Sequence, residues 1–451
     1  MYWTVHLDGG PRRVNHAAVA VGELIYSFGG YCIGSSFQET ELMDVHVLNS
    51  NNYRWTLLQQ DSDIDSRNIP FQRYGHTAVA HDHNIYIGEL IYSFGGYCIG
   101  SSFQETELMD VHVLNSNNYR WTLLQQDSDI DSRNIPFQRY GHTAVAHDHN
   151  IYIWGGRNNM QACNILYCFD TTNNQWSAPS VRGIVPGARD GHSACIINNK
   201  MYIFGGFVEH IQKFCQDVYY LDLTIMKWNY MCTTGEPPSY RDFHTSTPIG
   251  SRMYIFGGRG DRNSPYHSSQ ELYCNEMKYL ETDTATWHEA PVAGEIPIGR
   301  RSHSAFVYNN MIYVFGGYNA LEEEHFNDMY CFCPNTNVWC SVRAFGRSPC
   351  QRRRQACVIV RNKLYLFGGT SPKTTARFQS QRHLDDIDRS HALINHGDLH
   401  VLDFMPSLQI LCINIVIEHR LDQSHLPPMV QWEIKAMTTQ NSISRPKHST
   451  G

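Results

Sequence analysis

The chain has 451 residues, of which 36 are Lys or Arg and 43 are Asp or Glu, so its net charge is −7. Hydrophobic residues make up 42% and charged residues 18%, with 33 glycines and 26 tyrosines, and this composition excludes a disordered chain or a long coiled coil. The acidic balance also argues against a general binder of nucleic acid or anionic membrane, because such binding needs a positive surface.

No stretch approaches the roughly 20 apolar residues that span a bilayer, and no apolar signal region opens the chain. We therefore expect a soluble intracellular protein without direct membrane binding. The 14 cysteines are scattered, many of them within apolar strand patterns, so we interpret them as buried thiols. Cys331 and Cys333 have no second pair at zinc-finger spacing. The sequence thus predicts no metal site and no cofactor.

Internal repetition is the most informative feature of the chain. Residues 22–87 recur letter for letter as residues 88–153. An older, divergent repeat underlies this duplication, and its units are marked by seven double glycines that each end an apolar run, at 29–30, 95–96, 155–156, 205–206, 257–258, 316–317 and 368–369. After most of the double glycines come an alternating stretch and a tryptophan, namely Trp55, Trp121, Trp176, Trp228, Trp287 and Trp339. Each unit therefore predicts four strands.

A period near fifty residues with four strands, a double glycine and a later tryptophan resembles the kelch repeat, whose units are blades of a β-propeller. Glycine allows a tight turn with positive φ, and tryptophan buries a large surface between blades. We expect an all-β kelch propeller over residues 1–406, with seven blades, or six if one copy of the duplication is removed. The last unit lacks its tryptophan, so residues 3–7 are predicted to supply its outer strand and close the ring.

Two segments depart from the blade pattern. At the duplication junction, His76 and Gly95 are 19 positions apart, whereas His16 and Gly29 are 13 apart, so six extra residues must loop out. In the last unit, residues 371–397 form a polar insertion of mixed charge, which we expect to be a mobile loop.

Arginines recur three residues ahead of a histidine at the start of most units. In an up-and-down blade, the connection before the first strand and the connection between the second and third strands emerge on the same side. The pattern therefore predicts an arginine-lined mouth that binds a carboxylate, with a rim of Arg157, Arg189, Arg241 and Arg300. The alternative is that each arginine braces its own blade. The recurring histidines are interpreted as structural residues.

No catalytic motif lies in its proper context, so the sequence predicts a non-enzymatic protein. An oxidoreductase would need a bound metal and is the least favoured alternative. A scaffold that binds actin or chromatin proteins is the second alternative.

After Pro406 the strand pattern stops and a different kind of segment begins. Leu408, Cys412 and Val416 are four residues apart, so on a helix they form one apolar stripe. With the preceding serine they resemble the elongin-binding box of cullin-RING substrate receptors. Ten residues later comes a segment that resembles the cullin-2 box, with Leu426, Pro427 and Val430. We expect box helices over 407–435 and a flexible tail over 436–451; the alternative is an amphipathic helix packed on the propeller.

The order of these motifs, including RDGHSAC, FGGRGDR, GRRSHSAF and MPSLQILC, resembles that of kelch-repeat substrate receptors of cullin-2 RING ubiquitin ligases. The resemblance implies recognition of carboxy-terminal degrons that end in glycine, with elongin C, elongin B and cullin-2 as partners. It also implies a location in cytoplasm and nucleus, with links to chromatin and meiotic recombination.

In related receptors, arginines after the double glycine of a middle blade bind the terminal carboxylate of the degron. By this resemblance, Arg259 takes that position, Arg262 is a shifted equivalent, and Arg301 stands where a related receptor has a serine. The chain itself ends in glycine at Gly451, which predicts weak competition with an external degron.

Overall fold

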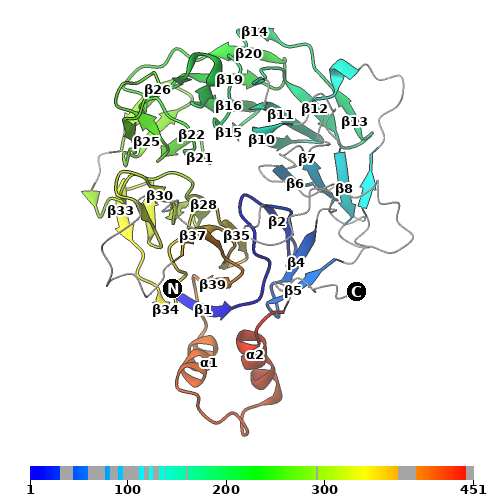
Figure 1. Cartoon of the computed structure of the whole chain (residues 1–451), viewed down its shortest axis with the longest axis vertical. Coiled ribbons are helices and arrows are strands. Elements are labelled where there is room, and N and C mark those ends of the chain that lie inside the picture. Colours follow the sequence, from blue (N-terminus) through cyan, green and yellow to red (C-terminus); the bar gives the residue numbers. More distant parts are fainter. Residues whose placement is uncertain are drawn as a thin grey trace, which may run out of the picture.

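The computed structural model describes residues 1–30, 44–58, 77–81, 90–94, 111–115, 121–124, 132–137, 139–158, 161–290, 293–373 and 393–442. Within these ranges, short antiparallel sheets are arranged as blades around a central axis, and two helices lie outside the ring (Figure 1). Neither helix is long and apolar enough to cross a bilayer.

Each blade is a meander of four antiparallel strands, so most pairing is between neighbours in sequence. The first three blades are β2 (Ala17–Val21), β3 (Leu24–Phe28), β4 (Val45–Asn49) and β5 (Arg54–Leu57); β6 (Thr77–His81), β7 (Leu90–Phe94), β8 (Val111–Asn115) and β9 (Trp121–Leu123); and β10 (Tyr140–His147), β11 (Asn150–Arg157), β12 (Tyr167–Asp170) and β13 (Gln175–Ser177). A 3-10 turn, η2 (Ser132–Asn134), precedes the third blade.

The next three blades are β15 (Ser193–Ile197), β16 (Lys200–Phe204), β19 (Val218–Asp222) and β20 (Lys227–Tyr230); β21 (Thr245–Ile249), β22 (Arg252–Phe256), β25 (Lys278–Glu281) and β26 (Thr286–Glu289); and β28 (Ser304–Tyr308), β29 (Met311–Phe315), β32 (Met329–Cys333) and β33 (Val338–Ser341). The last blade combines β35 (Ala356–Val360), β36 (Lys363–Phe367) and β39 (Leu399–Asp403) with β1 (Tyr2–Leu7) from the start of the chain.

The innermost strands close a complete ring. Contacts run in the order β2, β6, β10, β15, β21, β28, β35 and back to β2. The described strands therefore form seven blades, one for each double glycine of the sequence. β7 to β9 repeat the sequence of β3 to β5, whereas the sequence of β6 recurs within β10.

The amino-terminal strand closes the ring as predicted. β1 pairs antiparallel with β39, with Leu7 opposite Leu399, and Trp3 is buried. Short edge strands β14 (Arg182–Gly183), β27 (Ala293–Gly294) and β34 (Phe345–Gly346) each run parallel to the outer strand of the following blade. Gly346 has φ +85°, and a Cβ there would lie 2.4 Å from the Trp3 carbonyl oxygen, so only glycine fits. A Cβ on Gly183 of β14 or on Gly294 of β27 would likewise clash with the carbonyl oxygen of Trp228 or Trp339. Trp3 therefore takes the position in the last blade that these tryptophans take in their own blades.

The duplication junction keeps the strand register of the first blade. Thr77 pairs with Phe94 and His81 with Leu90, which matches the pairing of β2 with β3. The extra residues thus fall between β6 and β7, in residues 82–89, which lie outside the described residues.

Four short hairpins extend the blades on one side of the ring. They are β17 (Phe207–Val208) with β18 (Lys213–Phe214), β23 (Gly260–Asp261) with β24 (Glu271–Leu272), β30 (Tyr318–Asn319) with β31 (Glu324–His325), and β37 (Thr370–Pro372) with β38 (Leu393–Asn395). The turn η3 (Glu209–Ile211) joins the first pair. The predicted loop 371–397 therefore begins and ends in strands, and its interior, 374–392, lies outside the described residues.

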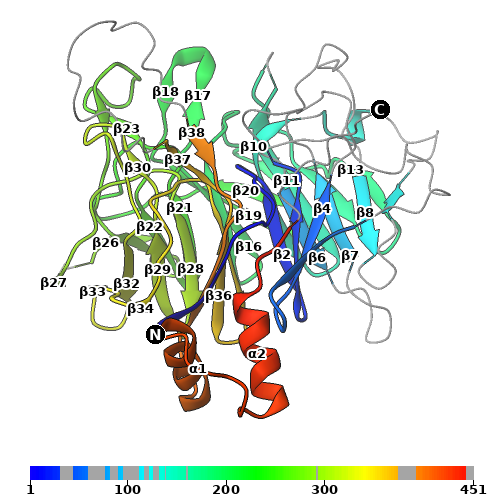
Figure 2. The same cartoon turned by 60° about the horizontal axis from the view of Figure 1, so that its bottom comes forward.

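The carboxy-terminal segment forms helices α1 (Leu408–Glu418) and α2 (Pro428–Thr438). Ser407 caps α1 by accepting a hydrogen bond from the Ile410 amide, as serine commonly does at this position. Figure 2 shows both helices at the end of the propeller away from the hairpins. The predicted boundary at 436 is too early: α2 reaches Thr438, and the Asn441 amide donates to the Asp8 carbonyl (2.8 Å). Residues 443–451, including Gly451, lie outside the described residues.

Candidate functional site

Three of the predicted rim arginines lie inside their blades. Arg189, Arg241 and Arg300 are at most 2% exposed. The Arg300 Nε donates to the Ile298 carbonyl (2.9 Å), and its Nη1 donates to the carbonyl of the double-glycine residue Gly316 (3.0 Å). Arg189 and Arg241 make the same two kinds of bond. The structure thus corrects the prediction that these three line the rim, because their donors are used to hold the blade.

Carboxylates complete this brace in several blades. Arg300 Nη2 donates to Asp328 Oδ2 (3.0 Å), Arg189 Nη2 donates to Asp217 Oδ2 (3.2 Å), and Arg352 pairs with Asp398 in the last blade. A buried guanidinium needs such partners, since an unpaired buried charge is strongly unfavourable.

The recurring histidines join neighbouring blades. The Nε2 atom of His192 lies 2.9 Å from Thr143 Oγ1, that of His244 lies 2.7 Å from Ser193 Oγ, and that of His303 lies 3.0 Å from Thr245 Oγ1, so each histidine contacts a hydroxyl of the preceding blade. Burial, with a smaller effect of Arg189, lowers the pKa of His192 to about 3, so its ring is neutral at pH 7. These contacts support the structural interpretation of the histidines.

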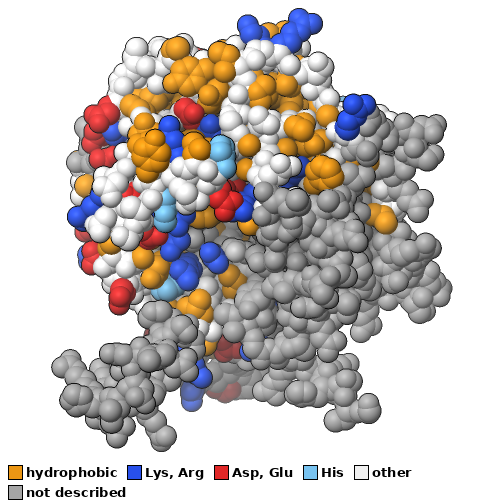
Figure 3. All heavy atoms as spheres, turned by 45° about the horizontal axis from the view of Figure 1, so that its top comes forward, with side chains coloured by type: hydrophobic (Ala, Val, Ile, Leu, Met, Phe, Trp, Pro, Cys, Tyr) orange, Lys and Arg blue, Asp and Glu red, His pale blue; other side chains and the backbone are white. Residues whose placement is uncertain are grey.

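The residue that follows each of the buried arginines Arg189, Arg241, Arg300 and Arg352 forms a β-bridge with a residue at the start of the hairpin of its own blade. These pairs are Asp190 with Phe207, Asp242 with Arg259, Arg301 with Tyr318, and Arg353 with Thr370. Successive blades therefore bring two aspartates and then two arginines to the same end of the ring. Figure 3 shows basic and acidic side chains interspersed with hydrophobic ones on the face it presents. We name the end of the propeller that carries these four residues the mouth.

Arg259 lies at the mouth but is already paired. Its Nε and Nη2 donate to the two carboxylate oxygens of Asp242 (3.1 and 2.6 Å), and Nη1 lies 3.6 Å from Glu271 Oε1. Its guanidinium also stacks near the rings of Phe214 and Phe243. Arg259 therefore has less capacity for a ligand carboxylate than the sequence predicted.

The two other arginines after the double glycines differ in exposure. Arg262 lies on the β23–β24 hairpin with an exposed side chain. Arg157 pairs with Glu209 and lies 5.9 Å from the centroid of the Tyr140 ring. Arg157 is thus at the rim, as predicted, but its charge is balanced.

Arg301 and Arg353 form a pair of cations at the mouth. Their guanidinium carbons lie 5.7 and 4.5 Å from the centroid of the same ring, that of Tyr318. Each Nε is buried without a hydrogen-bond partner, and neither arginine forms an ion pair within the described ranges. Burial and the neighbouring Arg301 both lower the pKa of Arg353. Two guanidinium groups that form no ion pair within the described ranges make this pair a candidate site for an anion.

Sequence reasoning identified Arg301 but not Arg353. The signal was present in the run Arg352, Arg353, Arg354, because Arg353 follows Arg352 as Arg301 follows Arg300. Ser302 and Arg354, the residues that follow Arg301 and Arg353, line a cavity of about 370 Å³ together with Phe243, Asn15 and the buried histidines. The arginine pair therefore adjoins a cavity large enough for the end of a peptide.

The tail offers a second candidate surface. Leu408 is 77% exposed on α1, and Cys412 one turn later is also exposed. Val416, the third member of the predicted stripe, is partly buried and packs with Ile410 against the core of the closing blade. Two of the three residues of the elongin-type box thus face solvent.

The cullin-type box is divided in a similar way. Leu426 and Val430 are partly buried against the core of the closing blade, whereas Pro427 is exposed and immediately precedes α2. Met429 and Trp432 on α2 are 75% and 52% exposed. These large apolar side chains are unusual on a free surface, and such patches commonly mark a protein interface.

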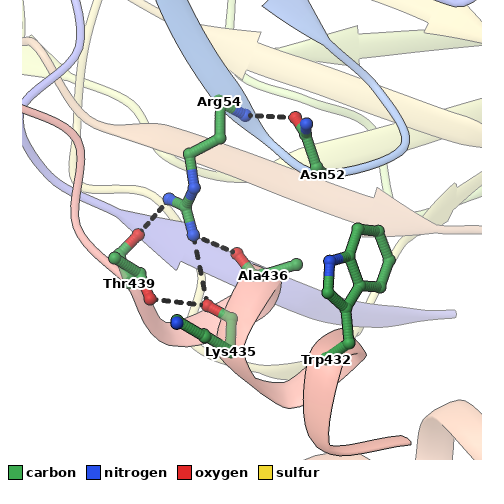
Figure 4. Close-up of a pocket in the computed structure, with 6 residues that line it drawn as sticks. All are labelled: Asn52, Arg54, Trp432, Lys435, Ala436 and Thr439. Carbon is green, nitrogen blue, oxygen red and sulfur yellow. Dashed lines mark hydrogen bonds between the residues drawn. The ribbon is translucent and has the colours of Figure 1, made fainter. Parts of the chain in front are cut away.

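Arg54 of β5 attaches α2 to the first blade (Figure 4). Its guanidinium donates to the carbonyls of Lys435 (3.1 Å), Ala436 (3.0 Å) and Thr439. A cation at the carboxyl end of a helix satisfies carbonyls that lack partners in the helix and interacts favourably with the helix dipole. This contact fixes α2, and with it the exposed ring of Trp432, relative to the propeller.

Comparisons with known proteins agree with this architecture. The family model described as the KLHDC2/KLHL20/DRC7 Kelch-repeats domain matches residues 15–164, 86–209 and 141–369. The chain belongs to the kelch-repeat family. It is 42% identical over 445 residues to "Kelch domain-containing protein 3" of Bos taurus and equally to that of Homo sapiens, covering 98% of both chains in each case. It is 25% identical over 333 residues to "Kelch domain-containing protein 2" of Bos taurus, covering 66% of this chain and 76% of the relative.

The match to the kelch domain-containing protein 3 relatives extends over almost the whole chain, so it includes the tail as well as the blades. Kelch propellers are generally protein-interaction domains without catalytic activity. The fold class predicted from the sequence is confirmed, and a protein-binding role for this propeller is supported.

Proposed function

We propose that this chain is the substrate-recognition subunit of a cullin-2 RING ubiquitin ligase. In this proposal, the mouth binds carboxy-terminal glycine degrons, and the tail docks elongin C, elongin B and cullin-2. The exposure of Leu408 and Cys412 on one face of α1 carries the proposal. An apolar pair without a partner within the described residues fits a helix that lies in the groove of another protein.

The arginine pair at the mouth supports the substrate half of the proposal. A carboxylate accepts two parallel hydrogen bonds from a guanidinium, and Arg301 and Arg353 lie beside one tyrosine ring with unused donors. Glycine has no side chain, so a terminal glycine carboxylate can approach two neighbouring guanidinium groups closely.

The two surfaces are far apart. Figure 2 shows the hairpins of the mouth at one end of the propeller and α1 and α2 at the other. A peptide at the mouth would therefore leave the helices accessible. This separation suits a receptor that holds a substrate and a ligase scaffold at the same time.

The tail assignment is tested by the double variant Leu408→Ser with Cys412→Asp. We expect elongin B and C to be lost from the purified complex, because polar groups would enter an apolar groove without partners. A matched control is Ile225→Ser, which changes a 60% exposed residue on the propeller. Elongin binding retained by the double variant would reject the box assignment.

The mouth assignment is tested with a glycine-ended peptide and its carboxy-terminal amide in a fluorescence polarisation titration. The amide should bind more weakly by about 1.5–3 kcal/mol, the range for hydrogen bonds to charged groups. A peptide with one added residue after the glycine provides a second control. Equal affinity of the acid and the amide would reject carboxylate recognition.

A further inference from the structure

The closing blade brings together two histidines and an aspartate that are far apart in sequence. His6 of β1 and His400 of β39 are directly opposite each other, and their ring centroids are 4.4 Å apart. Asp398 comes two residues before His400, so its side chain is on the same face of the sheet. One ligand atom from each of the three lies within 4.8 Å of the others.

Both histidine rings are largely buried. Their side chains are 12% and 2% exposed, and the Nδ1 atom of each is buried without a hydrogen-bond partner in the described part of the chain. Because His400 Nε2 lies 3.0 Å from Asp398 Oδ2, one metal ion at about 2.0–2.2 Å from each atom fits between them.

Asp398 is held in place by Arg352. Its two oxygens accept hydrogen bonds from Arg352 Nη1 and Nη2, both at 2.8 Å, and His400 Nε2 lies 3.0 Å from Oδ2. Arg352 thus orients the Asp398 carboxylate, as outer partners orient ligands in protein metal sites.

The first blade shows that this triad is not a by-product of the repeat. There, Asp44 and His46 occupy the positions of Asp398 and His400, and Arg13 pairs with Asp44. The cross-strand partner of His46, however, is Leu57. The third ligand is thus present in the closing blade because β1 comes from the start of the chain.

We propose that the closing blade binds one divalent metal ion of the zinc class through His6, Asp398 and His400. Two imidazoles and one carboxylate form a common zinc ligand set that leaves a fourth position for water. The ion would join the amino-terminal strand to the last blade and thereby stabilise the closure of the ring. Cys350, His396 and Asp398 form a second triad that shares Asp398, so the test must distinguish the two.

The test is a Zn²⁺ titration of the full-length chain after treatment with a chelator, followed by calorimetry. We expect one equivalent of Zn²⁺ to bind. His6→Gln removes a direct ligand and should weaken binding by about 100-fold or more, because changing only an outer partner of a ligand already costs about 10–100-fold. Cys350→Ser should bind as the wild type does. His149→Gln changes an exposed histidine of the sequence HDH and is the matched control.

A second measurement does not depend on how the variants fold. Hydrogen exchange of residues 2–7 in the wild-type chain should slow when Zn²⁺ is added, because the ion binds only the closed ring. The proposal is overturned if no Zn²⁺ binds, or if binding persists in His6→Gln and is lost in Cys350→Ser or His149→Gln. Unchanged exchange of residues 2–7 with Zn²⁺ bound would also overturn it.

Discussion

Arg300 and Arg301 are neighbours in sequence with opposite surroundings. Arg300 is fully buried, and its guanidinium is held by Gly316 and Asp328. Arg301 lies at the mouth against Tyr273 and Tyr318 and has no acidic partner within the described residues. The first position holds the blade together, and the second is the one to which we assign ligand binding in our proposal.

The last blade repeats this division with Arg352 and Arg353. The buried position is arginine in every blade from β10 onward, whereas the next position is Tyr140, Asp190, Asp242, Arg301 and Arg353 in turn. The constant position stabilises the blade, whereas the variable position that follows it sets the charge of the mouth. The comparison shows that the repeat itself points to the functional residues by excluding the structural ones.

The largest expected effect follows from removing a buried brace. Arg300→Ala leaves Asp328 without its counter-ion and the carbonyls of Ile298 and Gly316 without the donors that Arg300 supplies. We expect a loss of about 3 kcal/mol in the free energy of unfolding, at the low end for a broken buried pair because the Asp328 side chain is 32% exposed. Denaturant titration measures this loss. A stability equal to the wild type would contradict the assignment of Arg300 to the fold.

The matched change at the mouth should act on binding and spare stability. Arg301→Ala and Arg353→Ala should each weaken a glycine-ended peptide by about 1.5–3 kcal/mol, with little change in the unfolding midpoint. Arg259→Ala should weaken peptide binding less, because the Arg259 guanidinium already donates two hydrogen bonds to Asp242. Fluorescence polarisation measures these losses. If Arg301→Ala destabilises the chain as much as Arg300→Ala does, the distinction between neighbours fails.

The smallest effect concerns the acidic side of the mouth. Burial, opposed by Arg157, raises the pKa of Asp190 to about 6. Because the folded chain then holds a proton that the unfolded chain releases near pH 4, this residue contributes stability below pH 4 that is lost as the pH rises to about 6. Asp190→Asn should remove that part of the pH dependence. The difference in unfolding free energy between wild type and variant, measured from pH 4 to 7, should therefore change within this window and be constant above it.

Much of the fold could be predicted from local patterns. Double glycines, alternating strands and the following tryptophans are repeated in sequence, and the strands of a blade pair with their sequence neighbours. The missing last tryptophan even predicted that Trp3 would complete the ring. On the tail, helical spacing predicted the stripe of Leu408, Cys412 and Val416.

Other features depend on which side of an element faces the propeller. Spacing alone could not show that Val416 turns toward the core while Leu408 and Cys412 face solvent. It also could not separate Arg300 from Arg301, since both carry the same charge and only the folded backbone directs Arg300 inward.

The sequence by itself determined the blades, their number in this chain and the place where the ring closes, because these rest on contacts between nearby residues that recur in each unit. Only the tertiary structure decided which arginines meet at the mouth and that His6 lies beside His400 and Asp398. Those arrangements join residues of different blades or opposite ends of the chain. No periodicity encodes them, since they arise only when the ring has closed.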